Sequence, residues 1–191
     1  MMRCAFLTLG CRLNQYDTQA IREEVLRLGY VEVSPKEEAD LLVVNACTVT
    51  ARAGERSGGM VRKLARRNPG ATLLVTGCLT PGDREALSAI PEVRHIVGNE
   101  EKDQIPALLQ GTPRRRSGRG RRSRGILRLR TSRFHGHTRA FLKVQDGCDE
   151  RCTYCIIPFL RGRSRSRPRA AGDRAHGDPP APLRRRSRGS G

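Results

Sequence analysis

Four short apolar runs constrain the fold of this 191-residue chain more than any other feature of its sequence. Runs of this length, bounded by turn residues, are typical of strands that are covered on both faces of a parallel sheet. They alternate with stretches that have helical character, which predicts a three-layer α/β domain with a mostly parallel sheet. A flavodoxin-like and a Rossmann-like strand order both remain open. The runs are Cys4–Leu9, Leu41–Val44, Ala71–Val75 and Val93–Val97.

The segments between these runs supply the expected helices. After polar Cys11–Asp17, the apolar positions Ile21, Val25 and Leu26 form a helical stripe, and Gly29 follows at its end. A short alternating run at Tyr30–Val33 predicts one more strand. Gly58-Gly59 is a weak point inside the second helix, because each glycine costs about 1 kcal/mol relative to alanine. The remaining helices are expected over residues 50–67, 81–90 and 101–109, the last interrupted by Pro106.

Three cysteines follow three of the predicted strands. Cys11, Cys47 and Cys78 each come just after an apolar run. Because the carboxyl ends of parallel strands meet at one edge of a sheet, these thiols could converge on one point. The alternative is that they are small buried core residues, as free cysteines often are. Their expected loop positions weigh against that alternative, whereas Cys4, inside the first run, fits it well.

Three further cysteines lie within eight residues. Cys148, Cys152 and Cys155 have the spacing C-x3-C-x2-C, so one tight loop can aim them at one point, as in iron–sulfur proteins. A closed structural zinc site needs a fourth ligand, and the nearest candidates, His135 and His137, lie upstream. A cubane cluster held by three thiolates would keep one iron open for a small molecule. A zinc knuckle or a chance cluster is the alternative.

Positive charge is concentrated in the second part of the chain. The formal net charge is +18, yet residues 1–110 carry 14 basic and 14 acidic side chains, so the whole excess lies beyond them. Such an imbalance suggests a polyanionic partner, with RNA or DNA the usual candidates. A solvated arginine-rich segment without a partner is the alternative. The candidate RNA-binding residues are Arg114, Arg115, Arg116, Arg161 and Arg163.

The cysteine count and the hydropathy pattern indicate a cellular compartment. Seven cysteines are an odd number, no signal peptide precedes them, and no apolar run approaches the length of a membrane span. We therefore expect a cytoplasmic protein with reduced thiols, not bound to a membrane.

The composition divides the chain into four parts. We expect an α/β domain over residues 1–110, a basic low-complexity linker over 111–133, and the start of a second domain over 134–168. In that third part, a strand over Phe141–Val144 is expected to lead into the cysteine loop. Residues 126–130 add a marginal strand to the linker. Residues 169–191 predict a disordered basic tail, with the composition of a GC-rich coding region read out of frame.

Longer motifs around these cysteines resemble a known family. Residues 141–148 and 152–164 are similar to the radical S-adenosylmethionine loop of the methylthiotransferases, which act on tRNA adenosine or a ribosomal protein. Residues 8–17, 44–50 and 76–78 resemble the three motifs of that family's amino-terminal domain. Within the family, the motifs are most similar to the branch that modifies threonylcarbamoyladenosine in tRNA. The isopentenyladenosine and ribosomal-protein branches are next.

The resemblance implies cofactors, a reaction and partners. Cys148, Cys152 and Cys155 would hold a 4Fe-4S cluster that binds S-adenosylmethionine, with Tyr154 against the adenine of that cofactor. Cys11, Cys47 and Cys78 would hold a second, auxiliary 4Fe-4S cluster that delivers or carries sulfur. The substrate would be the threonylcarbamoyladenosine beside the anticodon in the tRNA anticodon loop, methylthiolated at C2, and a reductant protein would supply electrons.

The resemblance ends near Pro168, where the family continues through a βα barrel and an RNA-binding domain. The sequence therefore predicts only the first strand and cluster loop of an incomplete radical S-adenosylmethionine barrel. We expect a fragment that is inactive on its own. A non-catalytic iron–sulfur or RNA-binding fragment and a pseudogene product are the alternatives.

Overall fold

A five-stranded parallel sheet forms the centre of the molecule, in a computed structural model that describes residues 1–111, 131 and 141–167. The strand order is β2-β1-β3-β4-β5, which is the flavodoxin-like order. The α/β expectation is therefore confirmed, and of the two orders left open the chain adopts the flavodoxin-like one. The strands are β1 (Arg3–Thr8), β2 (Val31–Glu32), β3 (Leu41–Cys47), β4 (Thr72–Cys78) and β5 (Val93–Val97).

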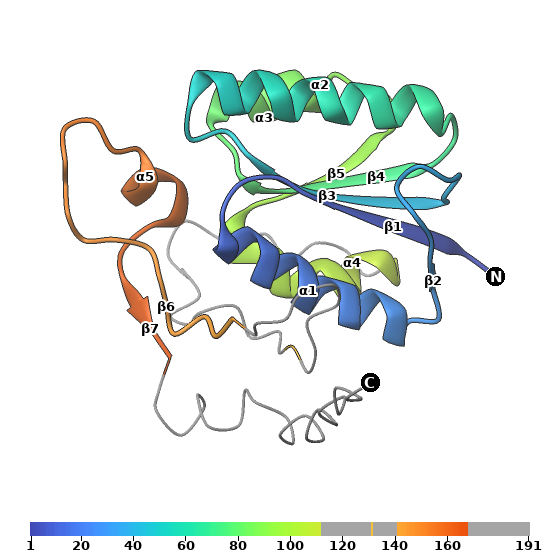
Figure 1. Ribbon diagram of the computed structural model, residues 1–191, viewed down its shortest axis with the longest axis horizontal. Coiled ribbons are helices and arrows are strands. Elements are labelled where there is room, and N and C mark those ends of the chain that lie inside the picture. Colours follow the sequence, from blue (N-terminus) through green and yellow to red (C-terminus); the bar gives the residue numbers. More distant parts are fainter. Residues whose placement is uncertain (112–130, 132–140, 168–191) are drawn as a thin grey trace, which may run out of the picture.

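Helices cover both faces of this sheet, which gives the three expected layers (Figure 1). Helices α2 (Ala51–Arg67) and α3 (Pro81–Ser88) lie on one face, and α1 (Arg12–Arg27) and α4 (Ile105–Leu109) lie on the other. A hydrophobic core lies on each face of the sheet, and alternate strand residues pack into one or the other. Val44 packs in the core on the α2 side, and Val43 packs in the core on the α1 side. No helix in the described ranges is long and apolar enough to cross a membrane.

Helix α1 begins earlier than the apolar stripe predicts. It starts at Arg12, directly after Cys11, so most of the polar stretch 11–17 is helical. Four polar side chains of this helix, Asn14, Asp17, Thr18 and Gln19, are buried rather than solvated. The apolar stripe therefore did not predict the first turns of α1, because the side chains that these turns bury are mostly polar.

Two strands and the last helix also differ from the expected bounds. Strands β3 and β4 extend through Cys47 and Cys78, so these cysteines are terminal strand residues and not loop residues. The burial of Cys78 also shows that the argument from loop positions was wrong for this residue. Instead of one helix over 101–109, a 3-10 helix η1 (Asn99–Gln104) precedes α4, with Pro106 in the first turn of α4.

Residues 141–167 pack at the carboxyl edge of the sheet (Figure 1). They contain the short strands β6 (Gln145–Asp146) and β7 (Arg165–Ser166), which pair antiparallel, and helix α5 (Ile157–Arg161) between them. The strand expected over Phe141–Val144 does not form there. The strand begins instead at Gln145, where pairing with β7 starts. The expected strand at 126–130, most of the basic linker and the tail 169–191 lie outside the described residues.

Candidate metal centres

Cys11, Cys47 and Cys78 come together at the carboxyl edge of the sheet. Cys47 and Cys78 are direct partners in the register of β3 and β4. Cys11 is the N-cap of α1 and follows Gly10, whose φ is 97°. A Cβ at residue 10 would lie 2.6 Å from the Cβ of Cys47 and 3.1 Å from its Sγ, so the Cys11 loop packs directly on Cys47. The strand ends thus bring these three cysteines to the same edge of the sheet.

The side chain of Asn14 fastens this loop to the sheet. Its Nδ2 donates hydrogen bonds to the carbonyl oxygens of Leu9, at 2.8 Å, and Ala46, at 3.2 Å. The Nδ2 of Asn45 in turn donates to the Asn14 carbonyl at 2.9 Å. Asn14 therefore ties the turn before Cys11 to the residue before Cys47. Sequence reasoning missed this role, although a run of polar residues directly after a strand end was visible.

Opposing effects act on the pKa of the Cys47 thiol. Burial raises this pKa, a backbone hydrogen bond from Val49 lowers it, the neighbouring Cys78 and Cys11 raise it, and the charge of Arg161 lowers it. Three thiolates at this edge would repel one another, so a bound metal centre would relieve this repulsion. The Nδ2 of Asn99 also donates a weak hydrogen bond to the Sγ of Cys78, at 3.5 Å.

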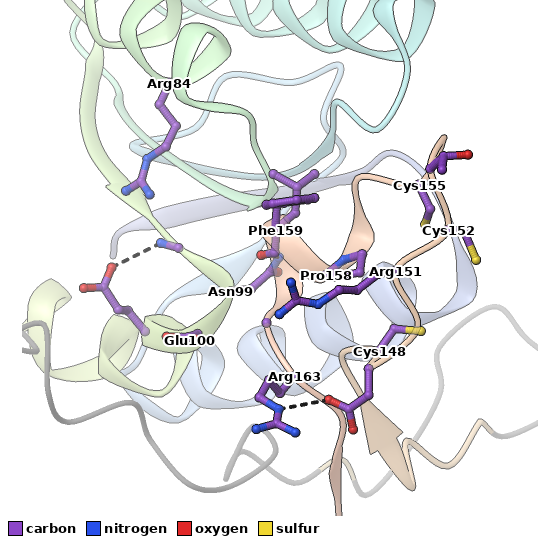
Figure 2. Close-up of a pocket in the computed structure, with 16 residues that line it drawn as sticks. Arg84, Asn99, Glu100, Cys148, Arg151, Cys152, Cys155, Pro158, Phe159 and Arg163 are labelled. Atoms are coloured by element: carbon purple, nitrogen blue, oxygen red, sulfur yellow. Dashed lines mark hydrogen bonds and ion pairs between the residues drawn. The ribbon is translucent and has the colours of Figure 1, made fainter.

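The second set of cysteines lines a large cavity beside the first. Cys148, Cys152 and Cys155 share a cavity of ≈970 Å³ with Asn99 and Glu100 of the α/β domain. Figure 2 shows the three cysteines along the loop, with Asn99, Glu100 and Arg84 on the domain across from them. Cys152 is exposed, and the other two are half-buried.

Backbone contacts hold this loop in its turn. The Cys148 amide donates to the carbonyl of Gly162 at 3.1 Å, and the Cys155 amide donates to the carbonyl of Cys152 at 3.0 Å. Gly147 has a φ of 79°, and a Cβ there would lie 2.2 Å from the carbonyl oxygen of Arg163. Only glycine fits this close approach of two backbone segments.

Both sets have the donor chemistry of an iron–sulfur cluster. Within the described ranges, no three His, Cys, Asp or Glu side chains are placed so that they could hold one metal ion. A cluster contains several iron atoms, so its ligands stand farther apart than those of a single ion, and its ligands are mostly thiolates. Three cysteines on one edge and three in one loop supply thiolates, the usual ligands of such clusters.

A network of buried charges lies between the two sets of cysteines. Asp17 of α1 holds the ammonium groups of Lys102, at 2.6 Å, and Lys143, at 2.8 Å. Lys143 also bonds Asp146, at 2.7 Å, and Asp146 bonds Arg161, at 2.8 Å. All five side chains are at most 5% exposed. The sequence analysis did not foresee this network.

Arg161 belongs to this buried network, which argues against the RNA-binding role that the sequence suggested for it. Its guanidinium is 3% exposed and bonds Asp146 and Asn14, so it is not available to an RNA phosphate in this arrangement. Arg163 is 84% exposed and pairs with Asp149 at the surface, at 3.2 Å. Tyr154 is 90% exposed beside Cys155. The candidates Arg114, Arg115 and Arg116 lie outside the described residues.

Comparison with known proteins identifies the family. The profile described as "Uncharacterized protein family UPF0004" matches residues 3–98, half of the chain. The chain belongs to the UPF0004 family. The matched region runs from β1 to β5 and contains Cys11, Cys47 and Cys78, so the family's own domain carries the first set of cysteines. The Cys148 loop lies beyond it.

Curated relatives extend the similarity through that loop. The threonylcarbamoyladenosine tRNA methylthiotransferases MtaB of Chlamydia pneumoniae and Aquifex aeolicus are 42% and 37% identical over 84% and 86% of this chain. The ribosomal protein uS12 methylthiotransferase RimO of a Synechococcus strain is 36% identical over 86%. The matches cover 36%, 42% and 36% of these relatives, so the chain spans about two fifths of their length. The resemblance to the methylthiotransferases is thus confirmed.

Among solved structures, a response regulator from Thermotoga maritima aligns with a TM-score of 0.43 and 14% identity, over 59% of this chain and 98% of that one. The fold assignment rests on the strand order of the sheet itself.

Proposed function

We propose that this chain is the cysteine-bearing amino-terminal part of a radical S-adenosylmethionine tRNA methylthiotransferase. The observation that carries the proposal is the position of two sets of three cysteines at one edge of the sheet. Asn99 connects them, since its Nδ2 donates to Cys78 and to the carbonyl of Leu160, and it lines the cavity of the second set. In this proposal, residues 1–110 form one domain, 111–133 a linker and 134–168 the start of the next.

Each set of cysteines would hold one 4Fe-4S cluster. Cys148, Cys152 and Cys155 would bind the cluster that, when present, supplies the electron for cleavage of S-adenosylmethionine. Cys11, Cys47 and Cys78 would bind the auxiliary cluster that carries sulfur. The ≈970 Å³ cavity offers the carboxylate of Glu100 and the amide of Asn99 as polar contacts for a small ligand. Tyr154, exposed beside Cys155, is the candidate to stack on the adenine of the cofactor.

The proposed substrate is tRNA carrying threonylcarbamoyladenosine next to the anticodon, as the names of the MtaB relatives suggest. The exposed guanidinium of Arg163 and the arginines at 114, 115 and 116 would contact phosphates without reading sequence. A tRNA substrate and a reductant protein would place the chain in the cytoplasm. Isopentenyladenosine in tRNA and, from the RimO relative, a ribosomal protein are the alternative substrates.

A chimaeric enzyme tests this function. Residues 1–167 would replace the matching part of the Bacillus subtilis MtaB relative, which is 36% identical to this chain. The chimaera would be expressed in a host that lacks the methylthio modification, and tRNA nucleosides would be measured by mass spectrometry. We expect 2-methylthio-threonylcarbamoyladenosine with the chimaera. We expect none after Cys47→Ala or Cys152→Ala, because each change removes one cluster ligand.

The same assay separates the alternatives. A methylthio group on isopentenyladenosine would change the assigned substrate. A soluble, folded chimaera that produces neither nucleoside would contradict the proposal. The 191-residue chain alone is expected to produce no modified nucleoside, since Tyr154 and Phe159 at the loop are exposed in the described part of the chain.

A further inference from the structure

The buried charges at the sheet edge form one connected path between the two sets of cysteines. The path starts at Asn14, which fixes the turn before Cys11 and the end of β3 through its Nδ2. The Oδ1 of Asn14 accepts a hydrogen bond from Nη2 of Arg161, at 2.9 Å. Nη1 of Arg161 donates to Asp146 Oδ1, at 2.8 Å. The same oxygen accepts from the amide of Gly147, at 2.8 Å, next to Cys148.

Arg161 is the central residue of this path. A guanidinium carries five N–H donors in a fixed plane, so two of its nitrogens can hold two acceptors in a set geometry. Here they hold an amide from α1 and a carboxylate from β6, which belong to opposite sides of the interface. A lysine in its place would keep the charge but has one nitrogen for both acceptors.

The buried network around this path has more positive than negative side chains. Among the described residues, the ionic network contains three cations, Lys102, Lys143 and Arg161, against two carboxylates, Asp17 and Asp146. A buried excess of positive charge is unfavourable unless an anion lies nearby. Arg161 brings this charge to the edge of the first set, because it holds Asn14, whose Nδ2 binds the carbonyl oxygen of Ala46 next to Cys47.

We infer that Arg161 is a positioning residue that docks the Cys148 loop on the Cys11/Cys47/Cys78 edge and brings a positive charge to that edge. Docking depends only on the contacts described above. The effect of the charge on a metal centre rests on the proposed function. The two parts therefore have separate tests.

Hydrogen exchange of the whole chain, without added metal, tests docking. We expect the amides of residues 145–166 to exchange at least tenfold faster in Arg161→Met than in the wild type. Arg161→Lys is expected to show a smaller increase, since an ammonium keeps the charge but lacks the two-nitrogen planar fork that fixes the geometry of both acceptors. The matched control is Arg163→Met, the same change two residues away at an exposed position, which should exchange within twofold of the wild type in β6 and α5.

Exchange in β3 and β4 reports whether each variant remains folded. If Arg161→Met unfolds the sheet, Asp146→Asn replaces it, because this change keeps the shape and removes the negative charge that pairs with Arg161. Unchanged exchange of residues 145–166 in a folded Arg161→Met or Asp146→Asn variant would overturn the docking role.

The midpoint potential of the auxiliary cluster tests the charge. Alanine at positions 148, 152 and 155 leaves only the Cys11, Cys47 and Cys78 set to bind a cluster. In that background, we expect a more negative potential in Arg161→Met and a value near the starting one in Arg161→Lys, because positive charge nearby favours the reduced cluster. Equal potentials in all three proteins would overturn this role. Failure of the background protein to bind any cluster would refute the proposed function instead, and the exchange result would still decide docking.

Discussion

Gly77, the residue before Cys78, decides whether the end of β4 can form. Its φ is 120°, and a Cβ at this position would lie 2.0 Å from the carbonyl oxygen of Ala46 on β3. We expect Gly77→Ala to lower the free energy of unfolding by roughly 3 kcal/mol or more, because backbone strain and a steric clash act together. Gly70→Ala is the control, since its φ of 94° is also left-handed but open space surrounds it. It should cost about 1–2 kcal/mol. Equal losses in urea unfolding would contradict the assigned clash.

Asp146 gives the fold a dependence on pH. Burial alone would raise the pKa of this carboxyl, but the charges of Lys143 and Arg161 lower it from 3.8 to about 2. Because the folded state prefers the ionised form, the stabilisation is complete above the unfolded pKa and is lost as pH falls through the folded one. Between about pH 4 and pH 2, the wild type should lose about 2 kcal/mol more stability than Asp146→Asn. Parallel pH profiles of the two proteins in denaturant titrations would contradict this.

At the scale of elements, α2 contains an avoidable weakness. Gly59 is exposed in the middle of the helix, and a Cβ there would meet no atom within 4 Å. Gly59→Ala should therefore raise the free energy of unfolding by about 0.5–1 kcal/mol. Gly54 of the same helix is the control. It is buried, and a Cβ there would lie 3.1 Å from Asp83 Oδ1, so Gly54→Ala should gain less or lose stability. Thermal unfolding that shows equal gains would contradict the argument.

The apolar runs were enough to predict the elements but not all of their ends. β5 has the predicted bounds Val93–Val97, because an apolar run and the strand coincide there. The start of α1 was missed because Asn14 and Asp17 are buried by hydrogen bonds and ion pairs rather than by apolar contacts. The ends of β3 and β4 were missed because polar Asn45 and Thr76 are ladder residues with buried partners of their own.

At the scale of the whole molecule, the sequence predicted which cysteines form each set but not how the second set is held. The Asp17 partners Lys102 and Lys143 lie 85 and 126 residues away along the chain. No local period or spacing connects such positions, and each lysine alone would have been expected at the surface. Only the fold shows that their charges meet at the carboxyl edge of the sheet.

Iron and acid-labile sulfide per chain, measured after anaerobic reconstitution, test the central claim that each set of cysteines binds a cluster. The wild type should contain about eight iron atoms, four for each 4Fe-4S cluster. Alanine at Cys148, Cys152 and Cys155 together should leave about four, and so should alanine at Cys11, Cys47 and Cys78. Zinc in place of iron, or full iron content in either triple variant, would contradict the account.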